Sequence, residues 1–276
     1  MKKSQSNRLT AQQKEGQGPI TIFHEDAQIH DKEVGNTSLF VKNQLEYEFP
    51  MLVFRYRKDL LKKEINEALQ KVDEDLGQTL FVESASIRPD GGLIEVRDDR
   101  GNWRVVLVSE AKHQGKDIEN IRAGKLVGKK NDQDLMAAGN AIERAYKNIN
   151  EIANYMLSER HFPYILFLEG SNFLTQNVTV ARPDGREVTL VYNDGTLNRL
   201  DRLTAANYGM HINMNLCKNK FVKCCGATIM LQAASIYTKG AGGHWNDRDM
   251  VMVMMEVART SLKLLGSDLF EQLSKR

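Results

Sequence analysis

The sequence predicts one α/β domain, in which helices flank a mixed central β-sheet and arms are appended to it. Three observations indicate this class. Two hydrophobic segments, 93–97 and 103–109, are separated by turn residues, as in a β-hairpin. A buried apolar segment at 162–168 follows a long helical pattern, which favours a parallel neighbour in the sheet. Neither an internal repeat nor a Pro/Ser-rich linker divides the 276 residues, so we expect a single domain.

The hairpin places charged residues at one of its ends. Residues 98–102 supply the turn, because Asp, Gly and Asn tolerate unusual backbone angles. Antiparallel pairing about this turn sets residues opposite each other when their numbers sum to about 200. Asp90 then faces Glu110. Lys112 lies two residues beyond Glu110 on the same strand, so both side chains project from the same face.

This trio of Asp90, Glu110 and Lys112 has the composition of a site for cutting phosphodiesters. Two carboxylates can hold a divalent metal ion, and a lysine can stabilise the charge of the transition state or help to deprotonate water. Burying the three groups without a ligand would be costly, because like carboxylates repel and unpaired charges lose solvation. The alternative is a simple turn followed by a surface ion pair.

A second Arg-Pro-Asp-Gly at 182–185 shows how weak the turn motif is by itself. It lies between the apolar segments 177–180 and 187–192, and no Glu-x-Lys follows its second strand. We expect this copy to be a plain hairpin turn. The case for catalysis at the first copy therefore depends on the Glu-x-Lys that follows it.

In the rest of the chain, the spacing of apolar residues is mostly typical of helices. Residues 134–158 form the clearest expected helix, with an apolar side that begins at Ala138 and ends at Met156. Further helices are expected at 59–75, at 197–208 and, Met-rich, at 250–273, and a further apolar element spans 229–237.

Two of these helices carry residues that could read DNA bases. Asn140 suits adenine and Arg144 suits guanine, each through two hydrogen bonds in the major groove. Gly139 allows close approach of another surface, and close helix packing is its alternative role. Arg199 and Arg202 lie three residues apart on the helix at 197–208, although exposed helix arginines usually contact neither bases nor phosphates.

Composition narrows the class of protein without deciding its function. The net charge is +2, and 41% hydrophobic with 27% charged residues is ordinary for a globular protein. No apolar run is long enough to cross a bilayer, so we expect no membrane partner. Residues 1–18 form a basic arm without the apolar stretch of a signal peptide, and it is either disordered or in contact with phosphates. Basic residues also follow the trio at Lys112, Lys116, Arg122, Lys125, Lys129 and Lys130.

The three cysteines, Cys217, Cys224 and Cys225, favour a reducing compartment, so we expect a cytoplasmic protein. Their number is odd, and they do not form a paired framework. A zinc site that combined them with His211 or His244 would lack the usual Cys-x-x-Cys spacing.

Long segments of the chain resemble the EcoRI-type family of type II restriction endonucleases. The resemblance covers nearly the whole chain and is carried by residues 87–92, 110–117, 128–144, 162–174, 197–209 and 268–273. It implies the PD-(D/E)xK restriction-endonuclease-like fold with DNA-wrapping arms, here an endonuclease domain at 19–276 after the arm at 1–18. It also implies a homodimer that uses Mg²⁺ to cut double-stranded DNA at the palindrome GAATTC, leaving 5′ overhangs with 5′-phosphate and 3′-hydroxyl ends.

The resemblance also assigns roles to individual positions. Asp90 and Glu110 would bind the metal together with the backbone carbonyl of Ala111, and Lys112 would support attack by water. The DNA-contacting positions that it implies are Arg88, Gln114, Lys116, Met136, Ala137, Ala138, Gly139, Asn140, Ala141, Arg144, Lys147, Asn148, Arg199 and Arg202. The sequence departs from the family pattern at Thr196 and in the segments 218–228 and 239–255.

Two other functions remain open at this point. A repair or junction-resolving nuclease could use the same trio and cut by DNA structure. A catalytically silent DNA-binding protein would bind without cutting, although the intact trio argues against it. If the family resemblance holds, the cell also needs a cognate DNA methyltransferase to protect its own sites, as a companion enzyme and not as a direct partner.

Overall fold

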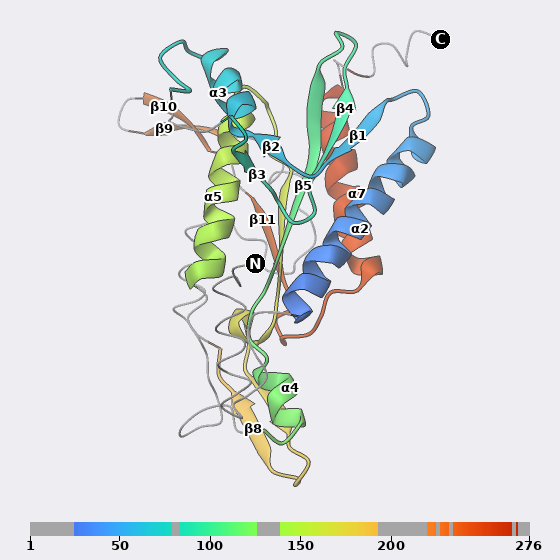
Figure 1. The fold of residues 1–276 in the computed structure, drawn as a ribbon, viewed down its shortest axis with the longest axis vertical. Coiled ribbons are helices and arrows are strands. Elements are labelled where there is room, and N and C mark those ends of the chain that lie inside the picture. Colours follow the sequence, from blue (N-terminus) through green and yellow to red (C-terminus); the bar gives the residue numbers. More distant parts are fainter. Residues whose placement is uncertain are drawn as a thin grey trace.

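The fold is described from a computed structural model, which places residues 25–78, 83–125, 139–192, 220–224, 227–231, 234–266 and 269 (Figure 1). The arm at 1–18 and the helix expected at 197–208 lie outside the described residues. So do Thr196, His211, Cys217 and Cys225.

A five-stranded mixed sheet forms the centre of the molecule, in the order β1-β4-β5-β6-β11. Three strands, β1 (Phe54–Arg57), β4 (Leu93–Arg97) and β5 (Trp103–His113), pair antiparallel. β6 (Tyr164–Glu169) then runs parallel to β5, and β11 (Ser235–Thr238) runs parallel to β6. The predicted α/β class with a mixed sheet is confirmed, as is the buried parallel strand expected at 162–168.

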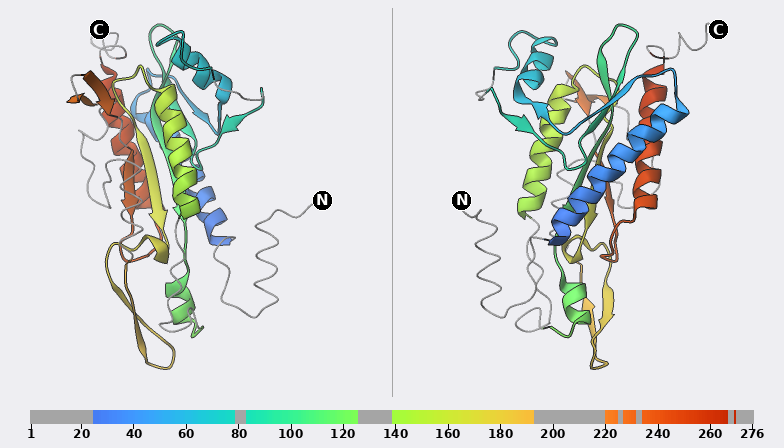
Figure 2. Two further views of the ribbon diagram at one scale, coloured as in Figure 1. Left: turned by 90° about the vertical axis from the view of Figure 1, so that its left-hand side faces the viewer. Right: turned by 45° about the vertical axis from the view of Figure 1, so that its right-hand side comes forward.

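Helices cover both faces of this sheet (Figures 1 and 2). On one face, α2 (Glu25–Glu48) and α7 (Asp247–Leu264) pack against each other and against β5. On the other face lie α5 (Gly139–Tyr155) and the shorter α3 (Lys62–Gln70), which contact one another. Each face therefore has its own apolar core, one under α2 and α7 and one under α3 and α5. No helix among the described residues is long and apolar enough to span a membrane.

Smaller strands form two-stranded sheets of their own, apart from the central sheet. The pairs are β2 (Leu60–Leu61) with β3 (Ser86–Ile87), β7 (Val178–Ala181) with β8 (Glu187–Leu190), and β9 (Lys220–Cys224) with β10 (Ala227–Leu231). The one-turn helix η1 (Ser171–Phe173) follows β6, and the short helix α4 (Asp117–Arg122) follows β5. Figure 1 shows α4 and the β7–β8 hairpin projecting beyond one end of the sheet.

The predicted register of the β4–β5 hairpin is confirmed, with one irregularity. Near the turn, the numbers of paired residues sum to 200, as for Arg97 opposite Trp103. A β-bulge in β5 then shifts the sum to 201, as in Leu93 opposite Val108. The extra residue changes which side chains of β5 share a face with those of β4. Beyond the bulge, Val108 faces the core under α5, whereas Ala111 faces the core under α2 and α7.

Several predicted elements differ in extent. The helix expected at 59–75 is only Lys62–Gln70, because Leu60 and Leu61 pair with β3 and Glu64 bonds the backbone N of Leu61 at 3.0 Å as a cap. The C-terminal helix begins earlier than residue 250, because Asn246 Oδ1 accepts the N–H of Asp249 at 2.8 Å. The single apolar element expected at 229–237 is two strands, β10 and β11.

The long helix expected at 134–158 is confirmed from Gly139 to Tyr155, and residues 156–158 form a turn. α5 buries the apolar side expected of it, at Ala145, Ile149, Ile152 and, just past its last residue, Met156. Helix α2 was not expected from the sequence, although its 24 residues include Val34, Val41 and Leu45 of the core.

A buried histidine makes the stability of the fold depend on pH. His161 lies just before β6 with 1% of its surface exposed, and its Nε2 donates to the carbonyl of Val105 at 2.7 Å. Burial lowers the pKa of His161 below its ordinary value, so the fold favours the neutral ring. The neutral ring therefore contributes fully to the free energy of unfolding above about pH 6.5. This stabilisation is lost as the pH falls below that value, because the unfolded chain then binds the proton more readily than the folded one.

We therefore expect acidification from about pH 7.5 to about pH 5.5 to lower the free energy of unfolding more in the wild type than in His161→Gln. The difference in slope should be at most about 1.4 kcal/mol per pH unit. Urea denaturation of both chains at the two pH values measures it. An equal change in the free energy of unfolding with pH in both chains would show that His161 does not make stability depend on pH.

Candidate active site

A tight loop fixes Asp90 beside β5. The N–H of Gly91 donates to the carbonyl of Ser109 at 2.9 Å, and the N–H of Gly92 donates to that of Pro89 at 2.9 Å. A Cβ atom at position 91 would lie 2.1 Å from Ser109 Oγ and 2.7 Å from Val34 Cγ1. Only glycine therefore lets this loop lie so close to the strand and to α2.

The three predicted catalytic residues meet as expected. Lys112 Nζ lies 2.5 Å from Asp90 Oδ2 and 2.7 Å from Glu110 Oε1. The same ammonium group donates to the carbonyl of Ala111 at 2.8 Å. The interpretation of Glu110 and Lys112 as a mere surface ion pair is wrong, since the Glu110 side chain is fully buried and that of Lys112 is 16% exposed.

Glu110 is held by two further side chains on the α5 side of the sheet. The hydroxyl of Tyr164, on the adjacent strand β6, donates to Glu110 Oε2. Asn148, from α5, donates through its Nδ2 to Glu110 Oε1 at 3.0 Å. Each of these contacts is one that the carboxylate accepts, so together they fix its orientation and favour its charged form.

Charge compensation dominates the electrostatics of the site. Burial alone would lower the pKa of Lys112, but the charges of Glu110 and Asp90 outweigh it and raise that pKa to about 12. Burial raises the pKa of Glu110, and the positive charge of Lys112 opposes this shift. Lys112 is consequently a protonated group at neutral pH, suited to stabilise negative charge and unsuited to accept a proton.

The oxygen atoms around Lys112 Nζ also suit a divalent cation. They are Asp90 Oδ2, Glu110 Oε1 and the carbonyl oxygen of Ala111, the same three groups that the family resemblance assigns to metal binding. Carboxylate and carbonyl oxygens are the hard ligands that Mg²⁺ prefers. Within this structure they already surround a positive charge, so the donor set fits the metal.

A further carboxylate lies near this site and was not expected from the sequence. Asp31, on α2, has a pKa raised to about 7, first by burial and then by the negative charge of Asp90. Tyr164 was missed as well, because a tyrosine inside an apolar strand shows that its hydroxyl needs a partner but not which one. Asn148 was expected along the DNA backbone, whereas here its amide bonds Glu110.

The other predicted DNA-contacting residues lie in different settings. Arg88 is exposed and pairs with Asp59 at 3.4 Å, while Gln114 is 3% exposed. Arg144 and Lys147 are exposed on α5, and Lys116 is half-buried just before α4. Gly139, Asn140 and Ala141 form the start of α5 as it is described. Met136, Ala137, Ala138, Arg199 and Arg202 lie outside the described residues.

The second Pro-Asp-Gly is a plain turn, as expected. It joins β7 to β8, and among the described residues Asp184 bonds only its near neighbour Arg186, whose backbone N donates at 3.1 Å and whose Nε donates at 2.8 Å. Both side chains are exposed. This copy therefore serves as an internal control for the first.

A mixed sheet that presents Asp90, Glu110 and Lys112 at one strand end defines a nuclease of the Asp…Glu-x-Lys class. The sequence comparisons narrow this class: a sequence model described as "Restriction endonuclease EcoRI" matches residues 16–272, so the chain belongs to the EcoRI family of restriction endonucleases. Its relatives include the type II restriction enzyme EcoRI of Escherichia coli, 65% identical over 274 residues and 99% of each chain. They also include the type II restriction enzyme RsrI of Cereibacter sphaeroides, 52% identical over 267 residues, 97% of this chain and 96% of that one.

The predicted resemblance is thus confirmed, and the chain is a type II site-specific deoxyribonuclease, a hydrolase that binds DNA.

The two Pro-Asp-Gly turns allow a test of how Asp90 is positioned. Gly91→Ala forces the loop away from Ser109 and α2, so we expect DNA cleavage to fall by at least about tenfold, since small misplacements of catalytic groups are costly. A Cβ atom at position 185 would meet no atom of the described residues within 4 Å. Gly185→Ala is therefore the matched control. It carries only the strain of a positive φ, and its cleavage rate should stay close to that of the wild type.

Initial cleavage rates of the two variants, compared at matched protein folding, measure this difference. Equal rates in Gly91→Ala and the wild type would show that the close approach does not position Asp90.

Proposed function

We propose that this enzyme uses Mg²⁺ to cut double-stranded DNA within GAATTC, leaving 5′ overhangs with 5′-phosphate and 3′-hydroxyl ends. The observation that carries the metal assignment is the convergence of Asp90 Oδ2, Glu110 Oε1 and the Ala111 carbonyl on one positive charge. The assignment of GAATTC as the DNA sequence that is cut rests on the extensive resemblance to EcoRI-type enzymes and on 65% identity to EcoRI itself.

In this mechanism, water attacks the scissile phosphate in line with the departing 3′-oxygen. Asp90, Glu110 and Ala111 would hold Mg²⁺, which supplies a Lewis acid and lowers the pKa of water. Lys112 places its ammonium beside the phosphate and offsets the negative charge that develops there. Tyr164 and Asn148 keep the Glu110 carboxylate in one orientation.

Sequence recognition is assigned to the segment that includes the start of α5. Met136 to Ala141 and Arg144 would read bases, and Arg199 and Arg202 would support that readout and couple it to cleavage. A homodimer fits a palindromic site, because each subunit then presents the same elements to one half-site. Arg88, Gln114, Lys116, Lys147 and Asn148 remain proposed DNA contacts.

In the proposed enzyme, the endonuclease domain spans 19–276 after the basic arm at 1–18, and the arm and other projecting segments would wrap the DNA. The enzyme would act in the cytoplasm, in a cell that also carries a cognate methyltransferase. The structure-specific nuclease and the silent DNA-binding protein are set aside, because the two relatives described above are named type II restriction enzymes.

Digestion of matched duplexes tests the function and the site together. One duplex contains GAATTC, the second differs from it by one base pair, and the third is a branched junction without the site. We expect the wild type to cut only the first, with Mg²⁺ and not with EDTA. Cutting of all three would indicate a structure-specific nuclease, and tight binding of the first without cutting would indicate a silent binding protein.

The same assay compares Asp90→Asn with Asp184→Asn, the equivalent changes in the two Pro-Asp-Gly turns. Asp90→Asn removes a charge that compensates Lys112 and a proposed metal ligand, so we expect cleavage to fall by about three orders of magnitude or more. Specific DNA binding should persist. Asp184→Asn should cleave at a rate near that of the wild type, because Asp184 is exposed and bonds its sequence neighbour Arg186. Similar rates in both variants would refute the assignment of Asp90.

Tyr164→Phe tests the support given to Glu110. The change removes the donor to Glu110 Oε2 and leaves the ring in place, so the buried carboxylate is less well oriented. We expect the Mg²⁺ concentration that gives half-maximal cleavage to rise about 10- to 100-fold, as is usual when a partner of a metal ligand is lost. A Mg²⁺ titration of the cleavage rate measures the shift. A lower maximal rate at an unchanged midpoint would contradict this role.

A further inference from the structure

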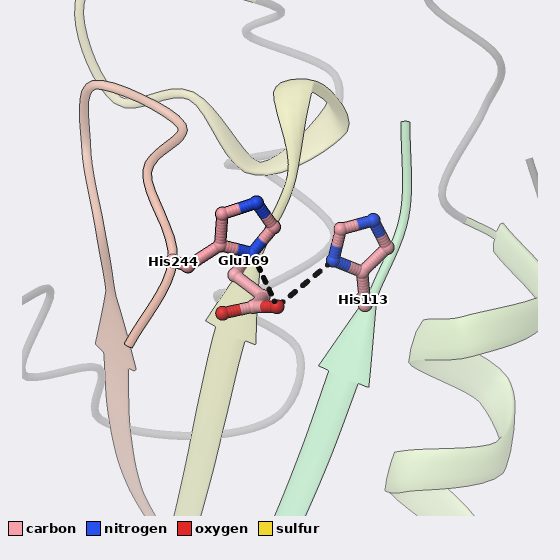
Figure 3. Close-up of side chains that lie close together, drawn as sticks. All are labelled: His113, Glu169 and His244. Atoms are coloured by element: carbon pink, nitrogen blue, oxygen red, sulfur yellow. Dashed lines mark hydrogen bonds and ion pairs between the residues drawn. The ribbon is translucent and has the colours of Figure 1, made fainter. Parts of the chain in front are cut away.

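We propose that His113, Glu169 and His244 form a second metal site, which takes a divalent transition ion of the zinc class and is separate from the catalytic trio. The three side chains converge as shown in Figure 3. Glu169 Oε1 lies 3.0 Å from His113 Nδ1 and 3.1 Å from His244 Nδ1. One ligand atom from each residue lies within 4.8 Å of the other two, so a single ion can contact all three.

The fold positions these residues at the ends of neighbouring parallel strands. His113 is the last residue of β5, Glu169 is the last residue of β6, and His244 comes from the loop before α7. His113 directly follows Lys112, and successive side chains of a strand project to opposite faces. The cluster therefore lies on the α2 and α7 side of the sheet, whereas the catalytic trio lies on the α5 side.

The arrangement of the rings supports a shared ligand. The imidazoles of His113 and His244 are stacked, with 5.8 Å between their centroids and 5° between their planes. Both present Nδ1 to the same carboxylate oxygen, so two nitrogen lone pairs and one oxygen become available to a cation when the rings are neutral and protonated on Nε2. A bound ion would replace the two hydrogen bonds to Oε1 with coordinate bonds.

A buried polar atom beside the cluster points to a ligand. Nε2 of His113 is buried without a hydrogen-bond partner in the part of the chain that is described. Such atoms are rare in folded proteins and often mark the place of a water molecule or ion. His30 Nδ1 lies 3.6 Å from Glu169 Oε2, so a third imidazole borders the carboxylate that would bind the ion.

Neighbouring groups would hold the ligands in place. The backbone N–H of Trp245 donates to Glu169 Oε2 at 2.9 Å and fixes that carboxylate. Glu119 Oε1 lies 3.8 Å from His244 Nε2, on the side of the ring away from the cluster. A carboxylate in that place commonly orients a metal-binding histidine and increases its basicity.

The ligand types select the class of ion. Two imidazoles and one carboxylate suit Zn²⁺, Co²⁺, Ni²⁺ or Cu²⁺, whereas Mg²⁺ and Ca²⁺ prefer oxygen ligands alone. The side chain of His244 is 57% exposed, so an ion can enter from solvent and water can complete its coordination. Zinc sites with three protein ligands of this kind keep such an open position.

Titration with Co²⁺ tests the site, because its visible absorption reports the geometry and identity of its ligands. The Asp90→Asn chain serves as the background, so that binding at the catalytic trio is weakened. We expect one Co²⁺ per chain with low-coordination absorption bands and without a thiolate charge-transfer band. His244→Gln should weaken this binding by at least about tenfold. Glu169→Gln should weaken it further, with circular dichroism as the control for folding.

His161→Gln is the matched control, because it removes a histidine whose Nε2 bonds Val105 and which takes no part in the cluster. Its Co²⁺ affinity should equal that of the background chain. Unchanged affinity in His244→Gln would overturn the proposal. A thiolate band would overturn it as well, since the ion would then be bound by cysteine. Because His244 is largely exposed, its variant remains informative even if Glu169→Gln does not fold.

Discussion

The ammonium group of Lys112 holds the active site together, because three oxygens converge on it in a largely buried setting. Asp90, Glu110 and the Ala111 carbonyl come from a loop and a strand, and each would be costly to bury without a positive partner. The proposed chemistry rests on the same convergence, since oxygens arranged around one positive charge suit a divalent ion as well. The charge balance of the buried cluster and its proposed capacity to bind metal thus derive from one arrangement.

The rest of the fold makes this convergence possible. The bulge in β5 sets which side chains share a face, so that Glu110 and Lys112 point towards α5 while Ala111 and His113 point towards α2 and α7. On the α2 side, Ser38 and Ser109 bond through their hydroxyls at 2.7 Å, which brings the helix close to the Asp90 loop. The two faces of one strand consequently serve two different clusters of polar residues.

Features that depend on local residue patterns could be predicted from the sequence, whereas contacts between distant segments could not. Periodicity predicts the pairing register of the β4–β5 hairpin, the shared face of Glu110 and Lys112, and the apolar side of α5. The structure confirms all of these. Helix α2 was missed because its buried side includes the polar Ser38 and Thr37 alongside valine and leucine. The contact of Tyr164 with Glu110 and that of Glu169 with His244 join residues 54 and 75 apart, and their chemistry is invisible until the chain is folded.

Locating a cation in crystals of the enzyme with a GAATTC duplex is the most direct test of this account. Crystals grown with Mn²⁺ in place of Mg²⁺ would reveal the ion by its anomalous scattering. The account predicts a Mn²⁺ ion bound by Asp90, Glu110 and the Ala111 carbonyl, next to a scissile phosphate of the duplex. A fully occupied ion elsewhere, with Lys112 still held by all three oxygens and the duplex uncut, would contradict it.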